Sequence, residues 1–106
     1  MKILIKPLSV NQAWQGKRYK TNVYLKYERD ILKLIPKEPI LPAPYRFDIT
    51  FGFSNKASDI DNPLKPFLDC IQKKYNINDK DIYELNVKKE IVKKGKEFID
   101  FKIYSI

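Results

Sequence analysis

The sequence predicts a single α+β domain covering residues 1–106, with helices packed on a small mixed sheet. The length of 106 residues suits one domain and no more. Hydrophobic residues make up 43% of the chain and charged residues 32%, which is a globular balance. Strand-like and helix-like periods follow one another in the order β-α-β-α-β-β, and this order is typical of a mixed sheet covered by helices.

The first half of the chain is expected to contain a strand, a loop and a helix. Residues 2–6 predict a short strand that ends at Pro7. Residues 8–20 have no clear period, so we expect a loop there. Thr21 is a suitable N-cap for a helix reaching Ile35. The apolar stripe predicted for that helix consists of Tyr24, Tyr27, Ile31 and Leu34.

The second half begins with an extended connector, because prolines recur between residues 36 and 44. Residues 45–54 alternate large apolar with polar or small side chains, which predicts a strand with one face in the core. Asn62-Pro63 favours the start of a second helix. Residues 82–92 and 98–106 predict two strands, and the short turn around Gly95 indicates that they pair as a hairpin.

The charge of the chain suggests a polyanionic partner. Lys and Arg number 21 against 13 Asp and Glu, which gives a net charge of +8 and a pI near 9.5. A compact basic domain attracts nucleic acid more often than a membrane surface. A lysine-rich coding bias would produce the same charge without any such partner.

The scarcity of histidine and cysteine excludes several kinds of chemistry. The chain has no His, which removes His-based acid–base catalysis, Ser-His-Asp triads and most zinc sites. Cys70 is alone, so no internal disulfide forms and a cytoplasmic location is expected. Cys70 is more typical of a small core residue than of a nucleophile. The opening residues are too short for a signal peptide or a membrane span.

The segment Asp59-Ile60-Asp61-Asn62-Pro63-Leu64-Lys65 is the strongest candidate for chemistry. Two carboxylates two residues apart can bind one hard cation such as Mg²⁺ where the chain turns. Lys65 follows Asp61 by four residues and returns to the same helix face. Asp79 or Asp81 offers a third carboxylate, which converges with the others if the next strand pairs beside the first. Such a set suits metal-assisted phosphodiester hydrolysis, in which a lysine offsets developing charge.

The acids of this segment also fit a simpler role at a helix start. An Asp-x-Asp pair alone is a weak signal, because Asp61 or Asn62 could simply cap a helix. A calcium-binding EF-hand loop is excluded because Pro63 stands where a ligand is required. The phosphatase signature Asp-x-Asp-x-Thr also fails at Pro63, and the chain is too short for its doubly wound sheet.

The same residues resemble the signature of the RusA-type Holliday-junction resolvases. Asp59-Ile60-Asp61-Asn62 is followed by Lys65, by Asp69 four residues later, and by Asp79 three residues before the expected strand. The segment from Pro7 to Asn11 is similar to the Pro-rich, Asn-containing opening of that family. The resemblance covers essentially the whole chain. The approach to Asp59 lacks the arginines that members often carry, so a different sequence preference is expected.

The resemblance implies a homodimeric endonuclease, frequently of phage or prophage origin, that acts in DNA recombination and repair. Such enzymes resolve four-way junctions by paired symmetric nicks that leave 5′-phosphates, and they use Mg²⁺ or Mn²⁺. Asp59, Asp61 and Asp79 would bind the metal, with Asp81 as second choice for the third acid. Lys65 would contact the scissile phosphate or support the transition state.

Basic residues that we expect to contact branched DNA gather in three places. Trp14 and Tyr19 are interleaved with one basic cluster, although Trp14 would equally suit the core or a dimer interface. Lysines between residues 88 and 96 are expected to be solvated. A non-catalytic nucleic-acid-binding module and a structural or inhibitory partner protein remain the alternative functions. The predicted DNA contacts are Lys17, Arg18, Lys20, Lys56, Lys73 and Lys74.

Overall fold

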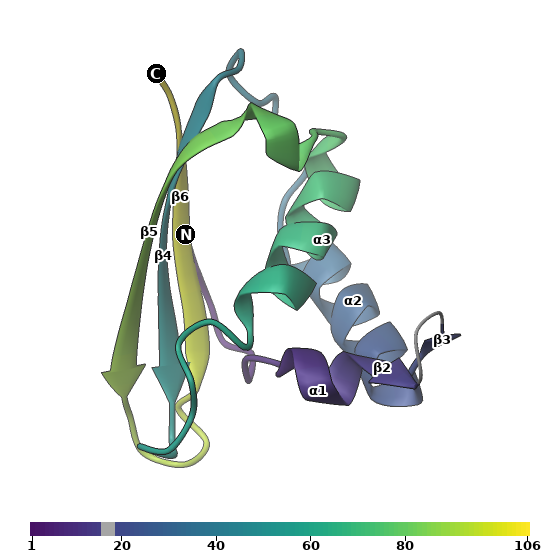
Figure 1. Ribbon diagram of the computed structural model, residues 1–106, viewed down its shortest axis with the longest axis vertical. Coiled ribbons are helices and arrows are strands. Elements are labelled where there is room, and N and C mark those ends of the chain that lie inside the picture. The colour runs from purple at the N-terminus through teal and green to yellow at the C-terminus, as the bar shows by residue number, and fades with distance from the viewer. Residues whose placement is uncertain (16–18) are drawn as a thin grey trace.

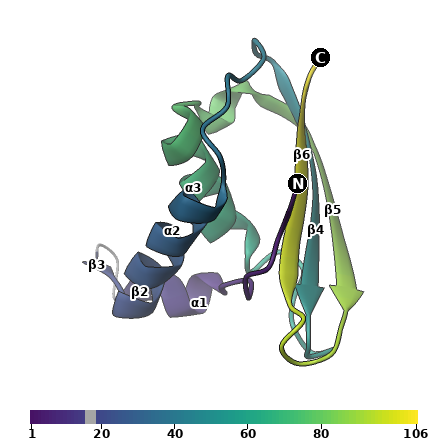
Figure 2. The same cartoon turned by 180° about the vertical axis from the view of Figure 1, so that it is seen from behind.

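A four-stranded mixed sheet with two long helices on one of its faces forms the body of the protein. The computed structural model describes residues 1–15 and 19–106. In both views the helices lie on the same side of the sheet (Figures 1 and 2). The predicted α+β class and element order are therefore confirmed. In spatial order the strands are β1 (Lys2–Ile3), β6 (Phe98–Ser105), β4 (Tyr45–Phe53) and β5 (Ile82–Ile91), and the covering helices are α2 (Asn22–Leu34) and α3 (Leu64–Tyr75).

Strand β4 is central because its apolar residues alternate as a strand with one buried face requires. Phe51 contacts Phe67 of α3 edge-to-face, with ring centroids 6.1 Å apart. Phe67 in turn contacts Phe101 of β6 at 5.4 Å, so one aromatic cluster joins the helix to two strands. The alternating residues of β4 that are buried beneath the helices are Tyr45, Phe47, Ile49, Phe51 and Phe53.

Helix α2 begins where the sequence predicts. Thr21 Oγ1 accepts a hydrogen bond from the Tyr24 amide at 3.1 Å, which satisfies one of the unpaired donors of the first turn. Tyr24, Tyr27 and Ile31 are buried, as expected. Leu34 is 51% exposed, so its assignment to the buried stripe was wrong. Ile35, directly after the helix, is buried instead.

The segment before α2 differs from the predicted loop. It contains the short helix α1 (Val10–Ala13) and strand β2 (Trp14–Gln15), which pairs antiparallel with β3 (Tyr19–Lys20). These elements are too short for a period to be visible in the sequence. Lys17 and Arg18 lie outside the described residues, and the side chains of Trp14 and Tyr19 are not described either.

The predicted hairpin of the last two strands was wrong. Strand β4 lies between β5 and β6, pairing parallel with β5 and antiparallel with β6. Helix α3 forms the crossover of the parallel β4-α3-β5 unit, which needs such a connection. The turn around Gly95 therefore passes the end of β4 instead of joining adjacent strands.

No helix within residues 1–15 and 19–106 is long and apolar enough to span a membrane.

Candidate functional site

The acidic residues after β4 lie in a loop that we call the acid loop, residues 54–63. Lys89 of β5 holds this loop, because its ammonium donates to the backbone oxygens of Lys56 at 2.7 Å and of Ser58 at 2.5 Å. The Asn55 carboxamide also accepts a hydrogen bond from the Ala57 amide at 2.8 Å. Lys89 thus attaches the acid loop to the helix-facing side of the sheet, although the sequence analysis expected a solvated lysine.

Asp59 and Asp61 are both exposed in the acid loop. The side-chain Nδ2 of Asn62 donates to Asp59 Oδ2 at 3.2 Å and orients that carboxylate. The Asp61 backbone oxygen accepts from the Leu64 amide at 3.1 Å, while Pro63 is the N-cap of α3. Because α3 has no side-chain cap hydrogen bond, helix capping does not explain the acids.

A cleft of about 410 Å³ opens beside the acid loop. Asp59 and Asn62 line it together with Lys6 and Ser9 from the start of the chain. The Val10 amide donates to the Asn62 backbone oxygen at 2.8 Å. Two segments that the sequence analysis singled out separately, one beginning at Pro7 and one at Asp59, therefore meet at this cleft.

Glu97 also lines the cleft, and sequence reasoning missed it. Its carboxylate accepts from Ser54 Oγ at 2.8 Å and from the Gly95 amide at 2.8 Å. Backbone hydrogen bonding, first from its own amide, and the Ser54 hydroxyl hold the pKa of Glu97 below its usual value. The expected hairpin placed Glu97 in a solvated turn. Only the position of β4 between β5 and β6 brings it beside Asp59.

A larger hollow of about 710 Å³ lies on the sheet face away from the helices. Asp48 and Asn86, which are hydrogen bonded at 2.9 Å, line it together with Lys88, Asp100 and Lys102. Charges of both signs are mixed there, and none of the predicted site residues contributes. The smaller cleft at the acid loop is the better candidate.

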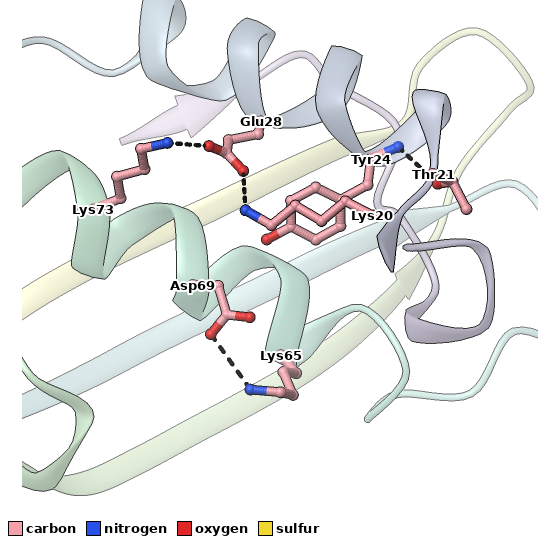
Figure 3. Close-up of polar contacts among 7 residues, drawn as sticks. All are labelled: Lys20, Thr21, Tyr24, Glu28, Lys65, Asp69 and Lys73. Atoms are coloured by element: carbon pink, nitrogen blue, oxygen red, sulfur yellow. Dashed lines mark hydrogen bonds and ion pairs between the residues drawn. The ribbon is translucent and has the colours of Figure 1, made fainter. Parts of the chain in front are cut away.

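Lys65 lies on the first turn of α3, close in sequence to Asp61. Its ammonium is 3.5 Å from Asp69 Oδ1 on the same helix, and the side chain is 66% exposed (Figure 3). Such an exposed pair is weak, about 0.3–0.5 kcal/mol. Lys65 can therefore leave Asp69 for a phosphate at little cost.

Asp79 and Asp81 lie at the opposite end of α3, in the short turn η1 (Asp79–Asp81) that precedes β5. The Asp79 amide donates to Gln72 Oε1 at 3.2 Å. Helix α3 alone, with its 12 residues, puts about 18 Å between the acid loop and η1. In Figure 1 the two segments lie at opposite ends of the helix.

The expected convergence of three acids at one edge is therefore wrong within one chain. Strand β5 does pair beside β4, but it runs parallel, with Ile82 opposite Tyr45, so it starts where β4 starts. In the described part of the chain, no cluster of three or more acidic or cysteine side chains could hold a metal ion. A single chain thus offers Asp59 and Asp61 without Asp79.

The predicted DNA contacts differ in how available their charges are. Lys20 and Lys73 both bind the carboxylate of Glu28, at 3.1 and 2.5 Å (Figure 3). Lys74 donates to the Leu32 backbone oxygen at 2.9 Å. Lys56 is exposed in the acid loop. Among these described lysines, Lys56 is best placed to meet a phosphate.

Cys70 lies in the core, 1% exposed, as the sequence analysis expected. Burial, with smaller contributions from nearby acids, raises the pKa of its thiol to about 12. A thiol this hard to ionise is not a nucleophile at neutral pH.

A scan against protein-family models finds no match to this sequence, and a search of the curated proteins finds no relative.

Proposed function

We propose that this protein is a metal-dependent DNA endonuclease that nicks four-way junctions in DNA recombination and repair. The observation that carries the proposal is the pair of exposed carboxylates, Asp59 and Asp61, in a loop that Lys89 holds against the sheet. Neither carboxylate caps α3, and Asp59 lines a cleft beside the acid loop.

The cofactor of the proposed enzyme is Mg²⁺, with Mn²⁺ able to substitute. Asp59 and Asp61 supply two oxygen-bearing side chains of the kind these ions prefer. One chain does not present the complete set of three, because Asp79 lies at the far end of α3. In a homodimer, as in the resembled family, a second chain would contribute acids of its own to the number available.

The other residues have roles that do not depend on the metal. Asn62 orients the Asp59 carboxylate through its hydrogen bond. Lys65 can move from Asp69 to a phosphate oxygen and offset negative charge there. Lys56 and Lys6 add positive charge beside the cleft, where the DNA backbone would pass. The proposal places the protein with bacterial or phage DNA in the cytoplasm.

The direct test uses a synthetic, end-labelled four-way junction and a matched linear duplex, each with Mg²⁺ and with EDTA. Wild type is expected to make paired nicks in the junction only, and only with Mg²⁺. Asp61→Asn is expected to lose cutting by about 10³-fold, the scale seen when a group that stabilises a transition state is removed, and to keep binding. The matched control is Asp30→Asn on α2, which should cut normally.

A non-catalytic, basic nucleic-acid-binding module is the alternative. The net charge of +8 suits this module as well as it suits the nuclease, and the lack of a three-acid cluster in the described part of one chain favours the module. Junction binding without cutting in either Mg²⁺ or Mn²⁺ would select this alternative. Failure to bind any nucleic acid at low salt would exclude both functions.

A further inference from the structure

The connector between α2 and β4, residues 35–44, carries prolines at a regular spacing. Pro36, Pro39 and Pro42 follow one another at intervals of three, and all three are exposed. They belong to no helix or strand. An interval of three matches the period of a polyproline II helix, which places such residues on one edge. The proposed function makes no use of this segment.

Proline chemistry restricts most of the connector to extended backbone. Each proline fixes its own φ at about −65°, and the residue before a proline is kept out of the helical region. Those preceding residues are Ile35, Glu38 and Leu41, and Ile35 has the extended values φ −88° and ψ 120°. From the first of these residues to the third proline, only Lys37 and Ile40 escape both restrictions. The segment is therefore prepared for the polyproline II form before any partner binds.

A polyproline II helix has three edges, and the domain covers one of them. Ile40 is half-buried and packs against the core, so the edge that carries it faces the domain. The second edge carries the three prolines, and the third carries Glu38 and Leu41. Leu41 is 58% exposed. A groove laid over the connector would meet the second and third edges together.

Hydrogen bonds hold the connector on the domain near both of its ends. Tyr75 Oη donates to the Pro36 carbonyl at 3.4 Å, and Ser105 Oγ donates to the Pro42 carbonyl at 2.5 Å. The backbone between these two points is thus already ordered. Binding of a partner costs less conformational entropy at such a segment than at a free chain, and this favours affinity.

Charge at the start of the connector indicates what surrounds the groove of the partner. Lys33, in the last turn of α2, and Lys37 are both exposed. Glu38 is the one acid in the sequence between Lys33 and the start of β4. The excess of positive charge is complemented by an acidic rim on the partner.

The connector lies far from the acid loop. It leads into the first residue of β4, whereas the acid loop follows the last one. The nine residues of β4 separate the two by about 26 Å. In Figure 2 the connector runs from the end of α2 to the end of the sheet opposite the acid loop. A partner bound there leaves the cleft beside Asp59 open.

We propose that the connector is a docking segment for a protein domain that has an aromatic-lined groove with an acidic rim. Grooves of this kind bind proline-rich segments in the polyproline II form. Pro39, Leu41 and Pro42 enter the groove, and Lys37 meets its rim. This inference goes beyond the proposed function and does not depend on it.

NMR titration of the whole protein with an SH3 domain and with a WW domain tests the docking segment, because both domains carry such grooves. Wild type is expected to bind at least one of them, with saturable shifts centred on the connector. Pro39→Ala and Pro42→Ala should each weaken that binding by about tenfold. Lys37→Glu should also weaken it, and added salt should reduce the difference from wild type. Ala43→Ser is the matched control, because Ala43 is exposed in the same connector on the edge of Ile40, and it should bind as wild type does.

Thermal unfolding checks that each variant is folded, and junction affinity is measured in parallel. Pro39→Ala should bind the junction as wild type does, because the connector is distant from the acid loop. A wild type that binds neither domain overturns the proposal and leaves the prolines as a rigid spacer. Binding that survives both proline substitutions, or that falls equally in Ala43→Ser, overturns it as well. A protein that binds a probe domain but never cuts DNA overturns the proposed function alone.

Discussion

At the scale of single residues, Glu28 carries a charge into the packed face of α2. The residue is 7% exposed, and its carboxylate contacts the ammonium groups of Lys20 and Lys73 (Figure 3). Burial acts to raise the pKa of Glu28, but hydrogen bonds from Lys73 and Lys20 outweigh it and hold that pKa below its ordinary value. A carboxyl with a lowered folded-state pKa stabilises the fold above its unfolded pKa. That contribution is lost as the pH falls through the folded value.

Replacing Glu28 by Gln should therefore destabilise the protein in a pH-dependent way. At neutral pH we expect the free energy of unfolding to fall by about 1–2 kcal/mol, since two charge-assisted hydrogen bonds are lost and Lys73 is largely solvated. At an acidic pH below the lowered pKa the difference should shrink, because wild type loses the same charge there. Urea titrations at both pH values measure it, with Glu38→Gln on the exposed connector as control. An equal deficit at both pH values would contradict the ion-pair explanation.

Gly52 is a second position where one side chain decides the packing. A Cβ at Gly52 would lie 2.3 Å from the Phe98 ring, which covers this glycine on the sheet face away from the helices. Lys2 lies over the same ring, 4.1 Å from its centroid.

Gly52→Ala should cost about 1–3 kcal/mol, because the ring must move from a well-packed position. In a Phe98→Ala background the same change should cost much less, since the clash is gone. A double-mutant cycle by urea unfolding measures this coupling. Additive effects would show that the ring adapts without strain.

At the scale of elements, the end of α3 determines how the chain reaches η1. Asn76 adopts a left-handed conformation, with φ 54° and ψ 47°, and its amide donates to the Gln72 carbonyl. This conformation ends the helix and directs the chain toward Asp79. Asn tolerates it better than residues with larger or branched side chains do.

Asn76→Ala should lower the free energy of unfolding by about 1 kcal/mol, because alanine has a steric cost in the left-handed region. Asn76→Gly is the matched control and should keep or raise stability. Thermal unfolding of the three proteins measures the difference. If alanine and glycine behave alike, the left-handed turn is not what ends the helix.

Elements with strong local signals could be predicted from the sequence. Thr21 and the apolar period that follows it located α2, and the alternation from Tyr45 to Phe53 located β4, because both signals come from neighbouring residues. The pairing of strands could not be predicted. A period shows that a segment is a strand but not which strand lies beside it, so β4 was not expected between β5 and β6.

The same limit explains what was predicted of the site. The acid loop was found because its two acids, Asp59 and Asp61, lie only two residues apart in the sequence. The role of Lys89 and the position of Glu97 depend on strand order, so no local signal marked them. Asp79 was assigned to the same edge because the parallel direction of β5 was not known.

At the scale of the whole molecule, the net charge of +8 overstates the charge available to DNA. Lys20 and Lys73 are bound to Glu28, and Lys89 is bound to the acid loop. Binding of a polyanion should depend mainly on lysines whose ammonium groups are not already bound to a carboxylate or to backbone oxygens of the protein. The salt dependence of binding can distinguish the two groups, because each phosphate contact releases condensed counterions.

Substituting Lys56 and Lys73 separately distinguishes lysines that are free to contact DNA from lysines that are bound within the protein. The affinity for a labelled four-way junction, measured by anisotropy in EDTA over a salt series, gives a slope of log K against log salt. Lys56→Gln should reduce the magnitude of that slope by about 0.9, the value for one lost phosphate contact. Lys73→Gln should leave the slope unchanged and lower the free energy of unfolding instead, because its ammonium stabilises Glu28. If Lys73→Gln reduced the slope as much as Lys56→Gln, Lys73 would have to exchange Glu28 for DNA, and the DNA-binding surface would extend from the acid loop to the far turn of α3.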